Sequence, residues 1–551
     1  MNVFIILLIL IDLQSISGLF NPGQVLEIPQ GKLRGLENRR RDYVKYLSIP
    51  YATFVGRYQN PGPPPLWDGI FNATRGNVFC AQLHKTMVPI GDEDCLTLNI
   101  YSPGQISYKK LLPVIVYIHG GGFMSGSSNE LIYNPEPIVR KNVIVVVINY
   151  RVGAFGFLCL KVKGAPGNAG LKDQVAALQW VNKNIQTFGG DPQSVTIVGA
   201  SAGGASVNYL MMSREARDLF HRAMIESGTA FSPFGFAQDP IERAALVASK
   251  LGYNTKNPFE LLNIFTNASK ADIINASIIE GTVDPMKRYI FRPCVEKQIL
   301  GGYPFITKTP KQIMESGDYN KVPVIVGYND KEGIMDESLL DDNLYQELEE
   351  HLDDTLPDNM VFTGYDQKSS LLKDLRDFYF QDNALDKSMA DSVIDYFSDA
   401  FYMYPAVVLT RYLLRDNKHP VFNYYFQYSS RRNIIKIMNG SGDKKGASHG
   451  DEVFYMFEPI GLFALPKSKK DAVLINRMTT MWTNFARTGD PTSIRSSVLP
   501  LKWSASDNQT LRFLIIDETL QMDTLPNPDR IEFWQTKYSN YGIITQPRNK
   551  Y

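Results

Sequence analysis

The chain has 551 residues, of which 44% are hydrophobic and 12% aromatic, enough to build a large packed core. Its 57 basic and 57 acidic residues balance, so no overall charge favours binding to nucleic acid or to an acidic membrane surface. The length allows several domains, but large α/β enzymes also reach it as one unit.

The first predicted element is a secretory signal peptide over residues 1–18. An apolar run at residues 3–11 is too short to span a bilayer but suits the hydrophobic region of a signal peptide. Ser15 and Ser17 supply small side chains for a cleavage site, although no Lys or Arg precedes the run. A buried first strand is the alternative. Because no second long apolar run follows, we expect a secreted protein without a membrane anchor.

Cysteines and sequons fit passage through an oxidising compartment. Cys80 and Cys95 lie close together in loop-like surroundings, so we expect a disulfide that closes a short loop. Cys159 lies in an apolar stretch and is interpreted as a buried thiol, whereas Cys294 has no assigned partner. A bond between these two is the alternative. The candidate glycosylation sites are the asparagines of five N-x-S/T sequons: Asn72, Asn267, Asn275, Asn439 and Asn508.

The chain alternates predicted strands with predicted helices. Apolar residues at helical spacing predict helices over about 173–188 and 470–487. Runs without polar alternation are typical of strands that are buried on both faces of a mostly parallel sheet. Such runs occur at residues 114–118, 143–148, 195–198, 322–327 and 421–428. The sequence therefore predicts an α/β fold with a large, mostly parallel sheet flanked by helices.

Two helix-rich stretches, near residues 242–303 and 340–404, interrupt this alternation. We interpret them as insertions that cap one end of the sheet and shape a substrate pocket. The alternative is that they are plain surface bulk. Residues 19–551 then form a single domain.

A serine between two glycines follows the predicted strand at residues 195–198. Residues 199–203 are Gly-Ala-Ser-Ala-Gly, the layout of a nucleophile elbow, in which a strand turns sharply into a helix. The elbow crowds the backbone, so that side chains at Gly199 and Gly203 would collide with neighbouring elements. This layout predicts Ser201 as a nucleophile, with a chance loop sequence as the alternative.

A serine hydroxyl needs a base to accept its proton and an acid to orient that base. In this layout both partners follow later strands. His419 precedes a proline at the start of a strand, whereas His449 lies in a glycine-containing loop and is the better base. The acid should follow the strand at residues 322–327, where Asp330 and Glu332 are both candidates.

A glycine-rich turn, His-Gly-Gly-Gly at residues 119–122, directly follows the strand at 114–118. Successive glycines let backbone N–H groups approach a carbonyl oxygen on which negative charge develops. The same motif occurs in lipases and esterases, and Ala202, after the serine, would supply another N–H. A phosphate-binding turn is the alternative, but it lacks the following Lys-Ser/Thr.

With these motifs the chain resembles a type-B carboxylesterase, in the cholinesterase-like branch of the α/β hydrolases. The likeness covers nearly everything after residue 18. Further motifs that carry it are Glu-Asp-Cys-Leu-Thr-Leu-Asn-Ile at 93–100, Asn-Tyr-Arg at 149–151, Gly-Asn-Ala-Gly-Leu-Lys-Asp-Gln at 167–174, Phe-Gly-Gly-Asp-Pro at 188–192 and Met-Trp-Thr-Asn-Phe-Ala at 481–486.

The resemblance implies an α/β-hydrolase fold with helical caps over the active-site gorge. It also implies a secreted serine esterase, most similar to insect carboxylesterases, that needs no metal or cofactor. The substrate would be a small-molecule ester, such as an odorant, pheromone, dietary or xenobiotic ester, cleaved through an acyl-enzyme intermediate.

The family likeness also implies roles for individual residues. The usual second disulfide of the family is not expected, because Cys159 and Cys294 do not match its closely spaced pair. The implied roles are nucleophile for Ser201, acid for Glu332, base for His449, oxyanion donors for Gly121, Gly122 and Ala202, triad support for Ser227, and a disulfide for Cys80 and Cys95.

Departures from the family pattern bear on the substrate. Ala200 stands where many relatives carry Glu, so a cationic substrate gains less attraction beside the serine. Residues 81–94 lack the tryptophan with which cholinesterases bind quaternary ammonium. Both departures favour neutral, apolar esters. Juvenile hormone esterases typically have Gln where Ala200 stands, so hydrolysis of that hormone is the second choice of function. A non-catalytic binding or adhesion protein is the alternative of a different class.

Overall fold

The structure, a computed structural model, describes residues 20–38, 40, 42–84, 87–104, 108–279, 281–381, 383–460, 467–494 and 496–542. The predicted signal peptide at residues 1–18 lies outside the described residues. Within the described part of the chain, no helix is long and apolar enough to cross a membrane.

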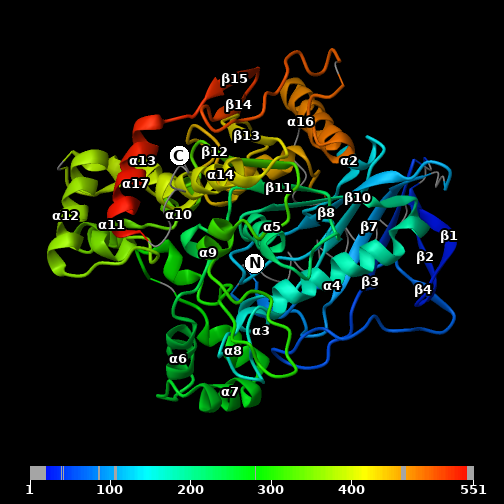
Figure 1. Cartoon of the computed structure of the whole chain (residues 1–551), viewed down its shortest axis with the longest axis horizontal. Helices are drawn as coiled ribbons and strands as arrows, with labels where there is room; N and C mark the ends of the chain where they lie inside the picture. The colour runs from blue at the N-terminus through cyan, green and yellow to red at the C-terminus, as the bar shows by residue number, and fades with distance from the viewer. Residues whose placement is uncertain are drawn as a thin grey trace.

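A mixed sheet of thirteen strands runs through the described part of the chain (Figure 1). Its order is β1-β2-β3-β7-β9-β8-β10-β11-β12-β13-β14-β15, with β4 paired to β2, while β5 and β6 pair separately. Neighbouring strands from β9 through β14 are parallel, and antiparallel strands extend both ends. The strands are β1 (Phe20–Ile28), β2 (Gly31–Asn38), β3 (Tyr43–Pro50), β4 (Ile70–Asn72), β5 (Gln82–Leu83), β6 (Pro89–Ile90), β7 (Thr97–Pro103), β8 (Leu112–Ile118), β9 (Ile144–Ile148), β10 (Gly190–Ala200), β11 (Arg222–Glu226), β12 (Val324–Asn329), β13 (Val421–Phe426), β14 (Arg512–Ile516) and β15 (Leu520–Thr524).

The five strands expected from continuous apolar runs are β8, β9, β10, β12 and β13 in the parallel part of the sheet. Every residue of β9, β12 and β13 is buried, as strands covered on both faces require. The antiparallel strands at the edges were not expected. Glycine and charged residues break the apolar runs of β2, and β15 has no buried residue.

Helices cover both faces of the sheet, and the sheet separates the core into two parts. Val116 and Ile118 of β8 pack in the core that includes the residues of α4 and α5. Ile115 and Tyr117 of the same strand pack on the other face with α16. The helices are α2 (Glu136–Val139), α3 (Gly153–Phe157), α4 (Ala169–Asn184), α5 (Ala202–Met212), α6 (Pro240–Lys250), α7 (Pro258–Asn267), α8 (Lys270–Ala276), α9 (Pro310–Ser316), α10 (Ile334–Glu337), α11 (Asp342–Glu350), α12 (Tyr365–Leu375), α13 (Ala390–Ser398), α14 (Tyr404–Asp416), α15 (Ile434–Met438), α16 (Lys469–Thr488) and α17 (Pro528–Tyr541).

The two helices expected from apolar spacing are α4 and α16. The first begins at Ala169, four residues earlier than expected, and the side chain of Asn168 before it bonds Cys294 and Glu296 instead of capping the helix. The second begins at a capping box of Ser468 and ends before Gly489, which has the left-handed conformation typical of a helix C-terminus.

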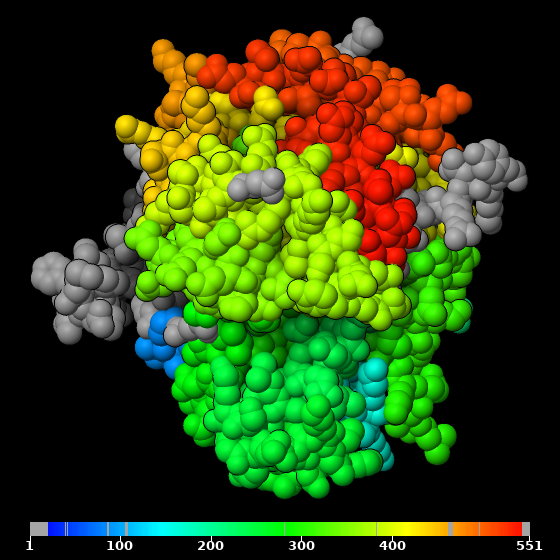
Figure 2. Space-filling view, turned by 90° about the vertical axis from the view of Figure 1, so that its left-hand side faces the viewer, coloured from blue at the N-terminus to red at the C-terminus, as the bar shows by residue number. Residues whose placement is uncertain are grey.

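The two interrupting stretches are helical, as expected. Residues 242–303 include most of α6 and all of α7 and α8, and residues 340–404 include α11, α12 and α13. Figure 2 shows them as neighbouring masses on one side of the molecule, green and yellow-green respectively. Their role as caps that shape a substrate pocket stays a prediction.

Two disulfides join the four cysteines. The expected bond between Cys80 and Cys95 is present. The interpretation of Cys159 as a buried thiol is wrong, because it is bonded to Cys294 across 135 positions of sequence. Asn168 brings the two segments together, since its side chain exchanges hydrogen bonds with the backbone of Cys294 at 2.8 and 2.9 Å.

Candidate active site

Ser201 occupies the sharp turn between β10 and α5. Its backbone has φ 60° and ψ −127°, a conformation that side chains adopt only under strain. Its N–H donates to the carbonyl of Glu226 at 2.8 Å. A Cβ on Gly203 would lie 2.1 Å from the carbonyl oxygen of Ile118, and one on Gly199 would lie 2.4 Å from the backbone of Gly203. The strand and helix therefore approach too closely for any side chain at the two glycines.

The glycine turn after β8 lies against this elbow. A Cβ on Gly120 would be 2.9 Å from the Cβ of Ser201. Gly121 and Gly122 have φ of 111° and 61°, the region that favours glycine. Among the described residues, the backbone N–H groups of Gly121, Gly122 and Ala202 have no hydrogen-bond partner. The turn and the helix start thus offer free donors beside Ser201.

His119 packs against the glycine turn. It is fully buried, its Nδ1 lies 2.9 Å from the carbonyl oxygen of Gly120, and its ring stacks on Tyr150 at 4.3 Å. Burial lowers the pKa of His119 to about 4, so the imidazole is neutral at physiological pH. These contacts make it a structural residue of the turn.

The loop after β12 meets the loop after β13 through Glu332 and His449. Nδ1 of His449 lies 2.7 Å from a carboxylate oxygen of Glu332, and both side chains are buried. The other candidate acid, Asp330, accepts instead from the backbone N–H of Ala447 at 2.7 Å. Asp330 therefore holds the histidine loop, while Glu332 holds the imidazole itself.

Glu332 is fixed on its other oxygen. Ser227, at the end of β11, donates to it at 2.5 Å, and the backbone N–H of Asn329 donates at 2.7 Å. Ser227 and Glu332 have no exposed surface. The serine singled out by the family likeness thus contacts the acid directly.

His449 has one ring nitrogen bound and one free. Burial lowers the pKa of His449, but the charge and hydrogen bond of Glu332, with smaller contributions from Glu452 and Asp336, raise it above the ordinary value. Within the described part of the chain, Nε2 has no hydrogen-bond partner. Catalytic hydrogen bonds are often long in ligand-free enzymes, so this nitrogen is available to a serine hydroxyl.

Two further buried acids, Glu452 and Glu226, were not predicted, because no sequence motif marks them. Glu452 bonds Asn329, and burial with the charge of Glu332 raises the pKa of Glu452 to about 8. Burial also raises the pKa of Glu226 well above its ordinary value, and Trp482 donates to it at 2.8 Å. Burial therefore favours the protonated form of both acids.

Aromatic side chains surround the same loops. The ring of Tyr402 lies 4.5 Å from the imidazole of His449, and Phe234 lies 5.6 Å from Tyr402. A Cβ on Gly122 would lie 2.1 Å from the ring of Tyr289, so this ring covers the glycine turn. Aromatic rings thus lie beside both the histidine and the glycine turn.

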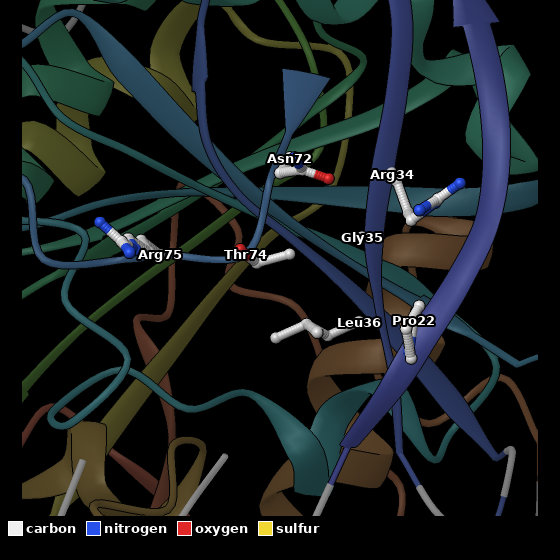
Figure 3. Close-up of a pocket in the computed structure, with 7 residues that line it drawn as sticks. All are labelled: Pro22, Arg34, Gly35, Leu36, Asn72, Thr74 and Arg75. Carbon is white, nitrogen blue, oxygen red and sulfur yellow. The ribbon is translucent and has the colours of Figure 1, made fainter. Parts of the chain in front are cut away.

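Other predicted positions lie apart from this cluster. A surface pocket of about 480 Å³ beside β1 and β2 includes Asn72 but none of the catalytic candidates (Figure 3). Its two cations, Arg34 and Arg75, lie on opposite sides and do not converge. The side chains of Asn72, Asn267, Asn275 and Asn508 are exposed and that of Asn439 is half-buried. Among the described residues, no group of three or more His, Cys, Asp or Glu could hold a metal ion.

Comparison with known proteins identifies the family of this chain. The profile of the carboxylesterase family matches residues 22–534. Venom carboxylesterase-6 of Apis mellifera is 32% identical over 92% of this chain and 93% of that protein, and esterase FE4 of Myzus persicae is 32% identical over 85% of each. A crystal structure of juvenile hormone esterase from Manduca sexta, with OTFP covalently attached, has a TM-score of 0.83 and 28% identity over 94% of this chain and 100% of that chain. The chain belongs to the carboxylesterase family and is a carboxylic ester hydrolase with the α/β-hydrolase fold.

Proposed function

We propose that this enzyme cleaves esters through an acyl-enzyme formed on Ser201. The Oγ of Ser201 attacks the ester carbonyl while Nε2 of His449 takes the hydroxyl proton. The N–H groups of Gly121, Gly122 and Ala202 stabilise the resulting oxyanion. His449 then gives its proton to the departing alcohol, and in a second round it activates the water that releases the carboxylic acid.

One observation carries this proposal: the imidazole of His449 is held on Nδ1 by Glu332 at 2.7 Å while its Nε2 is left free. A general base needs this arrangement, in which an acid holds one ring nitrogen and the other is left to accept the proton of the nucleophile. The covalently attached molecule in the juvenile hormone esterase structure supports a covalent mechanism in a relative of the same fold.

The substrates that we propose are neutral esters with apolar groups. Ala200 places a methyl group instead of a carboxylate next to the serine. The rings of Tyr402, Phe234 and Tyr289 give the surroundings an apolar character. Odorant, pheromone, dietary and xenobiotic esters all belong to this chemical class. The likeness to a juvenile hormone esterase makes that hormone a second candidate substrate.

The mechanism is tested by labelling and by substitution of the nucleophile. An organophosphate should label the wild-type enzyme at Ser201, as peptide mass spectrometry would show. Ser201→Ala should remove both the labelling and the turnover of a simple aryl ester while leaving the melting temperature unchanged. Undiminished turnover by this variant would exclude Ser201 as nucleophile. A panel of esters with varied acyl and alcohol chains, compared by kcat/KM, would then define the substrate.

We also expect secretion and glycosylation. Exposed asparagines in the sequons at Asn72, Asn267, Asn275 and Asn508 are accessible to the modifying enzyme. Expression of the full-length chain in insect cells should deliver protein to the medium that begins at residue 19 and loses mass on treatment with a glycan-cleaving amidase. Retention in the cells with residues 1–18 intact would contradict this expectation.

A further inference from the structure

A second carboxylate, besides that of Glu332, acts on His449. Asp336 lies in α10, four residues after Glu332, and is 1% exposed. It accepts a hydrogen bond at 3.0 Å from the hydroxyl of Tyr402. The ring of this same tyrosine lies 4.5 Å from the imidazole of His449. The three side chains form a continuous contact from acid to tyrosine to histidine.

Tyr402 reaches this position because of an irregularity in its helix. It lies on a π-helical turn, Asp399–Met403, between α13 and α14. Single π turns inside helices are often found at functional sites, since the extra residue redirects side chains. The hydroxyl of Tyr402 stays protonated, because burial raises the pKa of Tyr402 well above its ordinary value. The hydroxyl therefore keeps the proton that it donates to Asp336.

Helix α13, which leads into the π turn, also contacts the loop that carries Glu332. The backbone N–H of Gly333 donates to the side chain of Ser398 at 2.9 Å. A Cβ on Gly333 would lie 2.4 Å from the carbonyl oxygen of Ile394, so the loop and α13 touch backbone to backbone.

The charge state of Asp336 depends on what faces it. Burial raises the pKa of Asp336 to about 6, while His449, the hydrogen bond of Tyr402 and Arg288 lower it and Glu332 raises it. Tyr289 also faces this acid. Around His449, the acids are Glu332, Glu452 and Asp336. At pH 7 and above Asp336 is thus ionised, and its charge favours the imidazolium ion that forms during catalysis.

We propose that Asp336 and Tyr402 are positioning residues for His449: the tyrosine ring restrains the imidazole, and Asp336 orients that ring and stabilises the protonated histidine. This inference rests on the role proposed for His449 as the general base. It also bears on the expectation from Ala200 that no carboxylate lies next to the serine, because Asp336 supplies a carboxylate near the histidine instead.

The decisive experiment compares Asp336→Asn, Tyr402→Phe and Tyr402→Leu in the full-length enzyme. Tyr428→Phe is the matched control, because this buried tyrosine also donates to a buried aspartate, Asp471, at 3.1 Å. Melting temperatures, kcat and KM for an aryl ester, and the pH dependence of kcat/KM are measured for each protein. Labelling of wild-type Ser201 by an organophosphate establishes separately that the proposed mechanism holds.

Asp336→Asn should lower kcat by roughly 3- to 30-fold with little change in KM. It should also move the acidic limb of kcat/KM to lower pH by roughly half a unit, because one negative charge near the imidazolium is gone. Tyr402→Phe should give a smaller loss and Tyr402→Leu a larger one, whereas Tyr428→Phe should lose stability alone. Unchanged kcat and pH profile in all three variants would overturn the proposal, as would a rise of KM alone, which would place Asp336 in contact with substrate.

Discussion

The hydroxyl of Ser227 donates a hydrogen bond of 2.5 Å to the carboxylate oxygen of Glu332 that does not face His449. Because β11 lies between β10 and β12 in the sheet, Ser227 stands midway between the elbow and the acid loop. A Cβ on its neighbour Gly228 would lie 2.1 Å from the carbonyl oxygen of Ser201. One short segment thus contacts both the proposed nucleophile and the proposed acid.

Ser227→Ala should reduce kcat/KM by roughly ten-fold, since one hydrogen bond to a charged group is lost while Asn329 and His449 still hold the acid. The less solvated carboxylate should attract the proton on His449 more strongly and move the acidic limb of kcat/KM to higher pH. Ser206→Ala is the control, because Ser206 is equally buried and accepts one bond of 3.0 Å from Gln174. Equal losses of activity in both variants would mean that Ser227 acts only through stability.

The pH dependence should reveal the pairing of His449 with Glu332. A general base must be neutral, so activity falls as His449 takes up a proton. Because the pKa of His449 is raised above 6.5, mainly by Glu332, the midpoint of the acidic limb of kcat/KM should lie above pH 6.5. Glu332→Gln should lower kcat by about 10³- to 10⁴-fold. Its residual activity should persist to lower pH, because without the carboxylate of Glu332 the burial of the imidazole lowers the pKa of His449.

Asp330→Asn is the matched variant for this measurement. The amide oxygen can still accept from Ala447, so kcat/KM should stay within roughly 3-fold of wild type. A large loss in Asp330→Asn together with an active Glu332→Gln would reverse the assignment of the acid.

The sequence predicts those parts of the candidate site that are encoded locally. A sharp turn needs glycine at fixed positions, so the elbow around Ser201 and the turn at Gly121 and Gly122 leave a recognisable pattern. The choice between Asp330 and Glu332 has no such local basis. Both follow the same strand, and only the placement of the loop that carries His449 separates their partners.

Contacts between distant segments left no local pattern. Asp336 and Tyr402 are 66 positions apart, and their contact depends on a π turn that apolar spacing does not predict. The bond between Cys159 and Cys294 depends in the same way on Asn168, which joins the two segments. The edge strands were missed for another reason: strands with one exposed face carry mixed polar residues, which resemble loops in sequence.

The two disulfides should contribute unequally to stability. In the loop-entropy description, closing a loop of about 15 residues contributes about 3 kcal/mol, and closing one of more than 100 residues contributes close to 5 kcal/mol. The sequence separations here are 15 and 135. The double variant Cys159→Ala/Cys294→Ala should therefore melt at a lower temperature than Cys80→Ala/Cys95→Ala. The opposite order in calorimetry would show that local packing around Cys80 outweighs loop closure.

The packing of the elbow can be tested at Gly203. A Cβ there would lie 2.1 Å from the carbonyl oxygen of Ile118 and 3.0 Å from that of His119, and neither backbone group can move without shifting β8 or the glycine turn. Gly203→Ala should lower the melting temperature and remove the labelling of Ser201 by an organophosphate, because the oxyanion donors and the nucleophile lose their register. Gly364→Ala is the control, since its Cβ would meet open space. Wild-type labelling and stability in Gly203→Ala would show that strand and helix do not meet as closely as this structure places them.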